Sequence, residues 1–216
     1  MNRDLTDYRR SYERNELKEN DLPESPVELF SNWFKEVEDA GGVDETNAMT
    51  LTTFGLDGFP KSRIVLLKHF DQKGLVFYTN YTSEKGKAIQ ENNKVCISFF
   101  WPNLERQVII KGIAKTISEE KSTEYFKSRP RGSQLGAWAS DQSKVINSRE
   151  ALAERLAELA DKFENKEIPK PDFWGGYRVE PIEFEFWQGR PNRLHDRIRF
   201  QKINGNDTWK IERLSP

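Results

Sequence analysis

The sequence has little of what the common metal and nucleophile sites require. Its 216 residues include one cysteine, Cys96, and two histidines, His69 and His195, which lie far apart. A single cysteine excludes a disulfide framework and a cysteine metal cluster, so we expect Cys96 to be a small buried hydrophobe. No carboxylate spacing resembles a metal loop, and no GxSxG nucleophile motif is present. We therefore expect no metal, and any chemistry would have to come from a bound cofactor.

The chain also lacks a charge excess and a long apolar run. Its 34 basic and 35 acidic residues give a net charge of −1, so nothing in the totals indicates a nucleic-acid or polybasic membrane surface. Any anion site must be local. No segment approaches membrane-spanning length, and residues 1–20 lack the apolar core of a signal peptide. We expect a cytoplasmic protein.

Aromatic residues, by contrast, are plentiful. Six tryptophans and fourteen phenylalanines supply large buried areas, although only 36% of residues are hydrophobic. This composition is typical of a small aromatic-rich barrel or of an oligomer that shares its core. We expect a charged N-terminal arm over residues 1–20, either a solvated tail or a segment ordered only by contact, and one domain over residues 21–216.

The pattern of elements predicts a mainly β fold, a barrel with peripheral helices. A capping box at Ser25–Glu28 and a stop at Gly41 predict the first helix, and Asp57-Gly58 predicts a hairpin turn. Expected strands cover residues 48–54, 61–70, 75–80, 95–101, 106–117, 176–179, 182–188, 197–203 and 208–213, with a turn at Asn204-Gly205. Expected helices cover residues 83–92, 118–128 and 147–163, the last with Leu152, Leu156, Leu159 and Phe163 in the core.

Residues 184–200, FEFWQGRPNRLHDRIRF, concentrate cationic groups beside Trp187. If this segment is extended, alternation places Arg193, His195 and Arg197 on one face. Such a row either faces water, as in an edge strand protected by charges, or binds something planar and anionic.

Two other segments suit a phosphate. Arg63 and Lys68 are five positions apart on an expected strand, where they either serve two anionic groups or merely flank an apolar run. Lys85 falls in the first turn of an expected helix, where it opposes the helix dipole, and a bound anion would explain its position.

Tyr125, Arg129 and Ser133 surround a Pro-Gly helix break, which is either an exposed capping turn, the reading that this segment alone favours, or a second phosphate site. Polar groups nearby in sequence include Gln142 and Ser143. Gln107 interrupts an apolar strand and is either a satisfied buried amide or a hydrogen-bonding partner of a heterocycle.

Taken together, these motifs resemble the pyridoxamine 5′-phosphate oxidase family from about Tyr8 to Pro216. The matching segments are RIVLLK (63–68), FYTN (77–80), LERQV (104–108), YFKSRPRGSQLGAWAS (125–140), QS (142–143), FWGGYRV (173–179), EFWQG (185–189) and RLHDR (193–197). The resemblance implies an FMN-binding split β-barrel and a homodimer with FMN at the subunit interface. It implies oxidation of pyridoxamine or pyridoxine 5′-phosphate to pyridoxal 5′-phosphate, with dioxygen as acceptor and hydrogen peroxide released. The alternatives are a related split-barrel flavin-dependent reductase and a non-enzymatic flavin or pyridoxal-phosphate carrier.

The resemblance also implies roles for individual residues. Residues matching the family's FMN contacts are Arg63, Ile64, Val65, Leu66, Leu67, Lys68, Tyr78, Thr79, Lys85, Gln107, Gln142, Ser143, Trp187 and Arg197. Residues matching its substrate contacts are Arg9, Tyr12, Lys68, Tyr125, Arg129, Ser133, Arg193, Leu194 and His195. Arg193 and His195 are expected over the pyridine ring as the catalytic pair, and the arm carrying Arg9 and Tyr12 becomes a substrate lid.

One position departs from the family pattern. Glu84 stands beside Lys85 where the family usually has a second base for the FMN phosphate. A carboxylate pointing inward would repel a phosphate. We therefore expect Glu84 to face solvent and Lys87 or helix amides to compensate.

Overall fold

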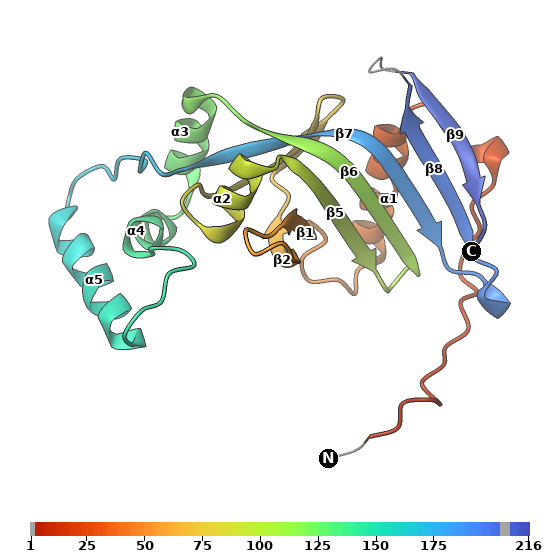
Figure 1. The fold of residues 1–216 in the computed structure, drawn as a ribbon, viewed down its shortest axis with the longest axis horizontal. Helices are drawn as coiled ribbons and strands as arrows, with labels where there is room; N and C mark the ends of the chain where they lie inside the picture. Colours follow the sequence, from red (N-terminus) through yellow and green to blue (C-terminus); the bar gives the residue numbers. More distant parts are fainter. Residues whose placement is uncertain (1–2, 204–207) are drawn as a thin grey trace. The chain divides into compact units, whose positions relative to one another are not determined.

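The computed structural model describes residues 3–203 and 208–216, and it forms two compact units. Within the described residues, the first unit contains residues up to 50, 97–111 and 182–216, and the second contains residues 51–96 and 112–181. Figure 1 follows the chain from its N-terminal arm to β9. The turn expected at Asn204-Gly205 lies outside the described residues.

The first unit is organised around α1 (Pro26–Ala40). Gly41, with a φ of 64°, ends this helix where the sequence predicted. Its apolar face buries Phe30 against Phe99 and places Trp33 edge-on to Phe186, with ring centroids 5.1 and 5.2 Å apart. The unit also holds parts of β5 (Lys94–Trp101), β6 (Arg106–Thr116) and β7 (Trp174–Gln188), together with η1 (Glu19–Asp21), η2 (Pro191–Arg193), β8 (Asp196–Lys202) and β9 (Trp209–Leu214).

The second unit combines short strands with helices that enclose an aromatic core. It contains most of β1 (Ala48–Phe54), with β2 (Pro60–Leu66), β3 (His69–Asp71), β4 (Gly74–Asn80), α2 (Glu84–Glu91), α3 (Glu119–Ser128), α4 (Arg131–Ala139) and α5 (Arg149–Lys162). Its buried cluster comprises Phe126, Leu135, Phe163, Ile168 and Trp174. Helices α4 and α5 pack side by side (Figure 1). This packing holds α4 in place beside the site described below.

Strand β7 changes its partner along its length. The hydrogen-bonded strand order is β2-β1-β5-β6-β7-β4-β3, with β8 on β7 and β9 on β8. Residues 174–179 of β7 pair antiparallel with β4, and residues 183–188 pair antiparallel with β8. Pro181 lies between these stretches and has no N–H to donate. The sequence predicted two strands here, and the structure has one.

Most expected elements are present, with several corrections. The expected strand 61–70 is divided into β2 and β3, and α4 was not predicted. The apolar stripe of α5 is mostly outside the core, because Leu156 is exposed and Leu152 and Leu159 are only half-buried. Phe163 alone of the four is buried. Cys96 is half-buried rather than buried.

Two kinds of feature are absent from the described residues. No helix within residues 3–203 and 208–216 is long and apolar enough to cross a membrane. The same residues contain no group of three or more histidine, cysteine or acidic side chains placed to hold a metal ion.

Candidate active site

Many of the expected residues meet in a cavity of about 450 Å³ in the second unit, here called the phosphate pocket. The expected residues that line it are Ile64, Val65, Leu66, Lys68, Tyr78, Thr79, Lys85, Tyr125, Arg129, Ser133 and Gln142. The sequence did not single out Asn80, Gly136, Ala137, Ser140 and Trp174, which complete the lining. None of the described lining residues is acidic, so the lining is cationic.

Three parallel rings form one wall of the phosphate pocket. Tyr78 from β4 stacks on Tyr125 from α3 with ring centroids 3.9 Å apart. Tyr78 also stacks on Trp174 from β7, 5.4 Å away and inclined by 10°. Burial raises the pKa of both tyrosines, so their hydroxyls stay protonated and can donate hydrogen bonds. The stack brings together side chains from β4, α3 and β7.

Arg129 is a desolvated cation at the end of α3. Its guanidinium carbon lies 4.8 Å from the centroid of the Trp174 ring, in a cation–π contact. Its Nη1 atom is buried and has no hydrogen-bond partner among the described residues. Burial lowers the pKa of Arg129, which shows how poorly solvated the charge is. A phosphate oxygen would supply the missing acceptor.

Two further cations are Lys85 on α2, which lines the phosphate pocket, and Arg63 on β2, which influences the charge of Lys85. Lys85 Nζ and Thr79 Oγ1 each lie 3.2 Å from Gln142 Oε1, to which both donate. The pKa of Lys85 is lowered by burial and by the nearby charge of Arg63, against a smaller opposing effect of Glu84. Burial likewise lowers the pKa of Arg63, whose Nη1 donates to Thr53 Oγ1 at 2.9 Å. An anion beside Lys85 would relieve this repulsion.

Glu84 is paired with a base that the sequence analysis did not name. Both of its carboxylate oxygens lie 2.6 Å from Lys61 Nζ, on β2. The Glu84 carboxylate is half-exposed and is neutralised by that lysine. That Lys87 or helix amides replace the second base for the FMN phosphate stays a prediction.

Three other expected residues of this unit do not line the phosphate pocket. Leu67 is buried in the core, and the Arg63 guanidinium donates hydrogen bonds to Leu51 and Thr53 of β1. Ser143 is exposed and has a φ of 74°, in the left-handed region.

A second group of expected residues lies in the first unit, around a cavity of about 740 Å³ that we call the arm pocket. Arg9 and Tyr12 from the N-terminal arm meet Arg193 and His195 there. Residues that the sequence did not indicate, Tyr8, Arg10, Ser11, Arg190 and Asn192, complete the lining.

The expected single row of Arg193, His195 and Arg197 is wrong. The chain there is not extended, because η2 precedes β8 and both Asn192 and Arg193 have left-handed φ values, 57° and 61°. Arg197 lies on β8, donates to Glu185 Oε1 at 2.8 Å and to the Ser215 carbonyl at 2.7 Å, and does not line the arm pocket. Leu194 is 69% exposed and does not line the arm pocket.

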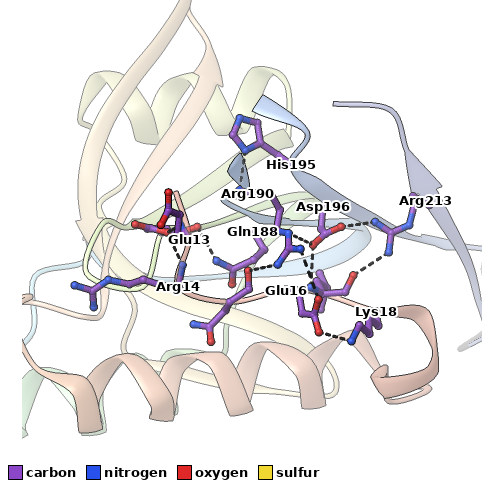
Figure 2. Close-up of polar contacts among 12 residues, drawn as sticks. Glu13, Arg14, Glu16, Lys18, Gln188, Arg190, His195, Asp196 and Arg213 are labelled. Atoms are coloured by element: carbon purple, nitrogen blue, oxygen red, sulfur yellow. Dashed lines mark hydrogen bonds and ion pairs between the residues drawn. The ribbon is translucent and has the colours of Figure 1, made fainter. Parts of the chain in front are cut away.

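His195 is held in one tautomer. Its Nδ1 accepts a hydrogen bond from the backbone N–H of Arg190 at 3.0 Å (Figure 2), so the neutral ring carries its proton on Nε2. Burial and the charge of Arg193 lower the pKa of His195, while Asp196 opposes them. At neutral pH the imidazole is therefore mainly uncharged and offers an N–H donor. Its ring lies 4.7 Å from that of Trp187.

Gln107 is the remaining expected cofactor residue, and it also falls in the first unit. It is half-buried on β6, on the face opposite Val108 and Ile110. It is therefore not the fully buried amide that was one alternative from the sequence.

Comparisons with known proteins identify the class and then the family. The chain resembles the solved structure of PhzG from Burkholderia lata 383 in complex with tetrahydrophenazine-1-carboxylic acid, with a TM-score of 0.84 and 31% identity over 91% of this chain and 95% of that chain. A pyridoxamine 5′-phosphate oxidase-related, FMN binding protein from Nostoc punctiforme shares the fold at 15% identity, with a TM-score of 0.69 over 90% of this chain and 100% of that one. The fold is thus the split barrel of FMN-binding proteins.

Family models and curated relatives narrow this class. Residues 35–163 match the model described as Pyridoxamine 5′-phosphate oxidase, and residues 174–216 match the Pyridoxine 5′-phosphate oxidase C-terminal dimerisation region. Pyridoxine/pyridoxamine 5′-phosphate oxidases from Flavobacterium psychrophilum and Flavobacterium johnsoniae are 60% and 61% identical to this chain, covering 99% and 98% of it and 100% and 99% of their own lengths. The chain belongs to the pyridoxine/pyridoxamine 5′-phosphate oxidase family.

Proposed function

We propose that this protein is an FMN-dependent oxidase that converts pyridoxamine 5′-phosphate and pyridoxine 5′-phosphate to pyridoxal 5′-phosphate. Dioxygen is the electron acceptor, and hydrogen peroxide is released, with ammonia from the amine substrate. The reaction belongs to vitamin B6 salvage. Near-full-length identity to curated oxidases supports the assignment. The structural observation that carries it is the phosphate pocket, which presents Lys68, Lys85 and Arg129 without an acidic neighbour among its described lining residues.

The phosphate pocket fits the anionic groups that the reaction requires. Lys85 with Gln142 is suited to the FMN phosphate, because burial and Arg63 disfavour the lysine charge more than Glu84 favours it. When bound, FMN supplies the two-electron acceptor that no side chain of the protein provides. A Cβ added to Gly136 would meet nothing within 4 Å, so there is room for a ligand against α4.

The substrate phosphate would be held by Lys68, Tyr125, Arg129 and Ser133, as the resemblance implies. Two cations and two hydroxyl groups match the charge and acceptor number of a dianionic phosphate. Fixing the phosphate fixes the ring, and such orientation can remove several kcal/mol, within the ~7–11 kcal/mol attributed to proximity effects.

Arg193 and His195 would act on the ring of the substrate. His195 donates a hydrogen bond from Nε2, because its Nδ1 is occupied by the N–H of Arg190. A proton on Nδ1 would break that contact, so we assign His195 no proton transfer. Arg193 keeps a left-handed backbone that costs of order 1–3 kcal/mol, a strain often found where a side chain must be presented to a ligand.

We further propose a homodimer with FMN at the subunit interface, supported by the matched dimerisation region. The arm over residues 1–20 as a substrate lid, the single domain over residues 21–216 and the cytoplasmic location stay predictions.

Anaerobic mixing of FMN-loaded protein with pyridoxine 5′-phosphate, followed by admission of air, tests the proposed reaction. We expect the visible absorbance of the flavin to bleach and then recover, with pyridoxal 5′-phosphate formed. An unchanged spectrum with the substrate demonstrably bound would overturn the oxidase assignment.

A further inference from the structure

One buried carboxylate holds the N-terminal arm. Glu105 lies in the turn between β5 and β6, is 2% exposed, and has a φ of 57°. Its Oε2 accepts hydrogen bonds from the backbone N–H groups of Glu13, at 2.9 Å, and Arg14, at 3.1 Å. Its Oε1 lies 3.4 Å from Arg10 Nη2. All three of these donors come from the arm.

The arm and Glu105 therefore stabilise each other. A buried carboxylate is costly unless hydrogen bonds or an ion pair satisfy it. Two consecutive backbone N–H groups pointing at one carboxylate oxygen resemble the concave amide arrangement that binds anions elsewhere in proteins. If the arm moves away, the charge of Glu105 loses these donors. If the charge is removed, the two amides lose their acceptor.

The same turn places Tyr12 against β7. Gly189 N donates to the Glu105 carbonyl at 2.8 Å, which ties the turn to the end of that strand. A Cβ on Gly189 would lie 2.8 Å from Tyr12 Cβ and 3.1 Å from Glu105 Cβ, so only glycine leaves space for this contact. The Tyr12 ring then meets Trp187 and His195 edge-on, at centroid distances of 5.6 and 5.8 Å.

A second set of contacts fixes the arm after Glu13. Asp196 Oδ2 accepts from Leu17 N at 3.0 Å, and Arg190 Nη1 donates to the Asn15 carbonyl at 3.1 Å. Arg213 Nη2 donates to the Leu17 carbonyl at 2.8 Å. Figure 2 shows Arg190, Asp196 and Arg213 converging on this stretch. Glu105 is the anchor next to Tyr12, and these contacts lie further along the chain.

We propose that Glu105 is a positioning residue that anchors the arm through the amides of Glu13 and Arg14. It thereby holds Arg9 and Tyr12 in the arm pocket beside Arg193 and His195. The part concerning substrate rests on the proposed function, whereas the anchoring does not. Loss of the anchor should weaken substrate binding and leave the chemical step largely unchanged.

The first experiment is hydrogen exchange on the FMN-loaded protein without substrate. In Glu105→Gln, exchange of the amides of Glu13 and Arg14 should accelerate about tenfold or more, the factor that corresponds to losing about 1.4 kcal/mol. Glu183→Gln is the matched control, because Glu183 is a largely buried carboxylate of the same unit that pairs with Lys111 at 2.7 Å. Unchanged protection of the two amides in Glu105→Gln would overturn the anchor, whatever reaction the protein catalyses.

The second experiment separates anchoring from a general structural role. Glu105→Gln should raise KM for pyridoxine 5′-phosphate about tenfold, by the same conversion, with kcat within about twofold. In the full-length Arg9→Ala/Tyr12→Ala background, the same substitution should raise KM no further. An equal increase in the two backgrounds, or an unchanged KM after protection is lost, would overturn the positioning role.

A variant of the arm itself covers the case in which Glu105→Gln does not fold. Glu13→Pro removes one of the two N–H donors at an exposed position and leaves Glu105 intact. It should accelerate exchange at Arg14 and raise KM in the same direction. Full protection at Arg14 together with an unchanged KM would count against the proposal.

Discussion

Arg129 and Lys85 carry their charges in surroundings that oppose charge. Burial is the first cause of the lowered pKa of each, and neither pairs with a carboxylate among the described contacts. Folding therefore already includes the free-energy cost of desolvating these cations, before a ligand arrives. An incoming phosphate then gains charge-assisted hydrogen bonds to groups already stripped of water.

Replacing Arg129 tests the proposal that this part of the phosphate pocket holds the substrate. Arg129→Met should raise KM for pyridoxine 5′-phosphate by roughly 10- to 100-fold, because a hydrogen bond to a charged group contributes about 1.5–3 kcal/mol. Steady-state kinetics gives KM, and titration of the apo-protein should show an unchanged dissociation constant for FMN. Arg131→Met is the control, because Arg131 donates to the carbonyls of Phe163 and Lys166 and does not line the pocket. Equal losses in both variants would contradict the assigned role.

The lowered pKa of Lys85 predicts pH-dependent FMN binding. FMN phosphate favours the charged amine, so binding should raise the pKa from its lowered value and take up a proton in the interval between the two. Affinity is then full below the lowered pKa and declines as pH rises through it. Lys85→Arg should remove this decline, because arginine stays charged. Fluorescence titrations at increasing alkaline pH measure the effect, and identical profiles for both proteins would exclude Lys85 as its source.

At the scale of the element, the sequence predicted those segments whose ends carry chemical signals. Ser83 and Ser118, where two helices were expected to begin, accept hydrogen bonds from the first turns of α2 and α3. Helix α4 was missed because Gly132 and Gly136 lower helix propensity, and packing against α5 overrides that preference. The continuity of β7 was missed because Pro181 is a typical strand breaker when a chain is read locally.

The site was predicted to the extent that its residues have distinctive chemistry. Cationic and hydroxyl residues of the phosphate pocket could be found from motifs. Trp174 and Gly136 lie inside matched segments but were not singled out, because an aromatic wall and an open glycine leave no polar pattern in the sequence. Glu105 was missed for a different reason. Its ligands are backbone amides, which every residue has, so no spacing of side chains could indicate it.

Helix α4 offers a matched pair of glycines. A Cβ on Gly132 or Gly136 would meet nothing within 4 Å, but only Gly136 lines the phosphate pocket. Replacing either with alanine should stabilise the apo-protein by about 0.5–1 kcal/mol, because alanine loses less backbone entropy in a helix. Thermal unfolding measures that gain. Gly136→Ala should also raise the FMN dissociation constant or KM severalfold, because its methyl group occupies ligand space. Parallel ligand affinities in the two variants would show that ligands do not approach α4 at this point.

At the scale of the whole molecule, the charges nearly cancel, so attraction for anions is confined to local groups. A cofactor at a subunit interface couples its binding to assembly. FMN should lower the dissociation constant of the dimer by the factor by which dimerisation raises FMN affinity.

Sedimentation equilibrium with and without FMN measures this coupling. We expect the apo-protein to dissociate at higher concentration than the loaded protein, by about tenfold or more, since couplings of about 1–3 kcal/mol are typical. Adding the phosphorylated substrate to the apo-protein without FMN is the control, because it shows whether binding of any phosphate group has the same effect on the dimer. Identical dimer dissociation constants for the apo-protein and the FMN-loaded protein would contradict the proposal that FMN binds at the subunit interface.

The parallel rings of Tyr78, Tyr125 and Trp174 have an optical consequence. Aromatic chromophores fixed in one chiral arrangement give near-ultraviolet circular dichroism, and the signal disappears when side-chain packing is lost. Because this stack is a wall of the phosphate pocket, the wall contributes to the dichroism of the flavin-free protein, alongside other packed rings such as those of Trp33 and Tyr177. A variant of the pocket whose spectrum matches that of the unaltered protein has therefore kept its aromatic packing, and this can be established before any ligand is added.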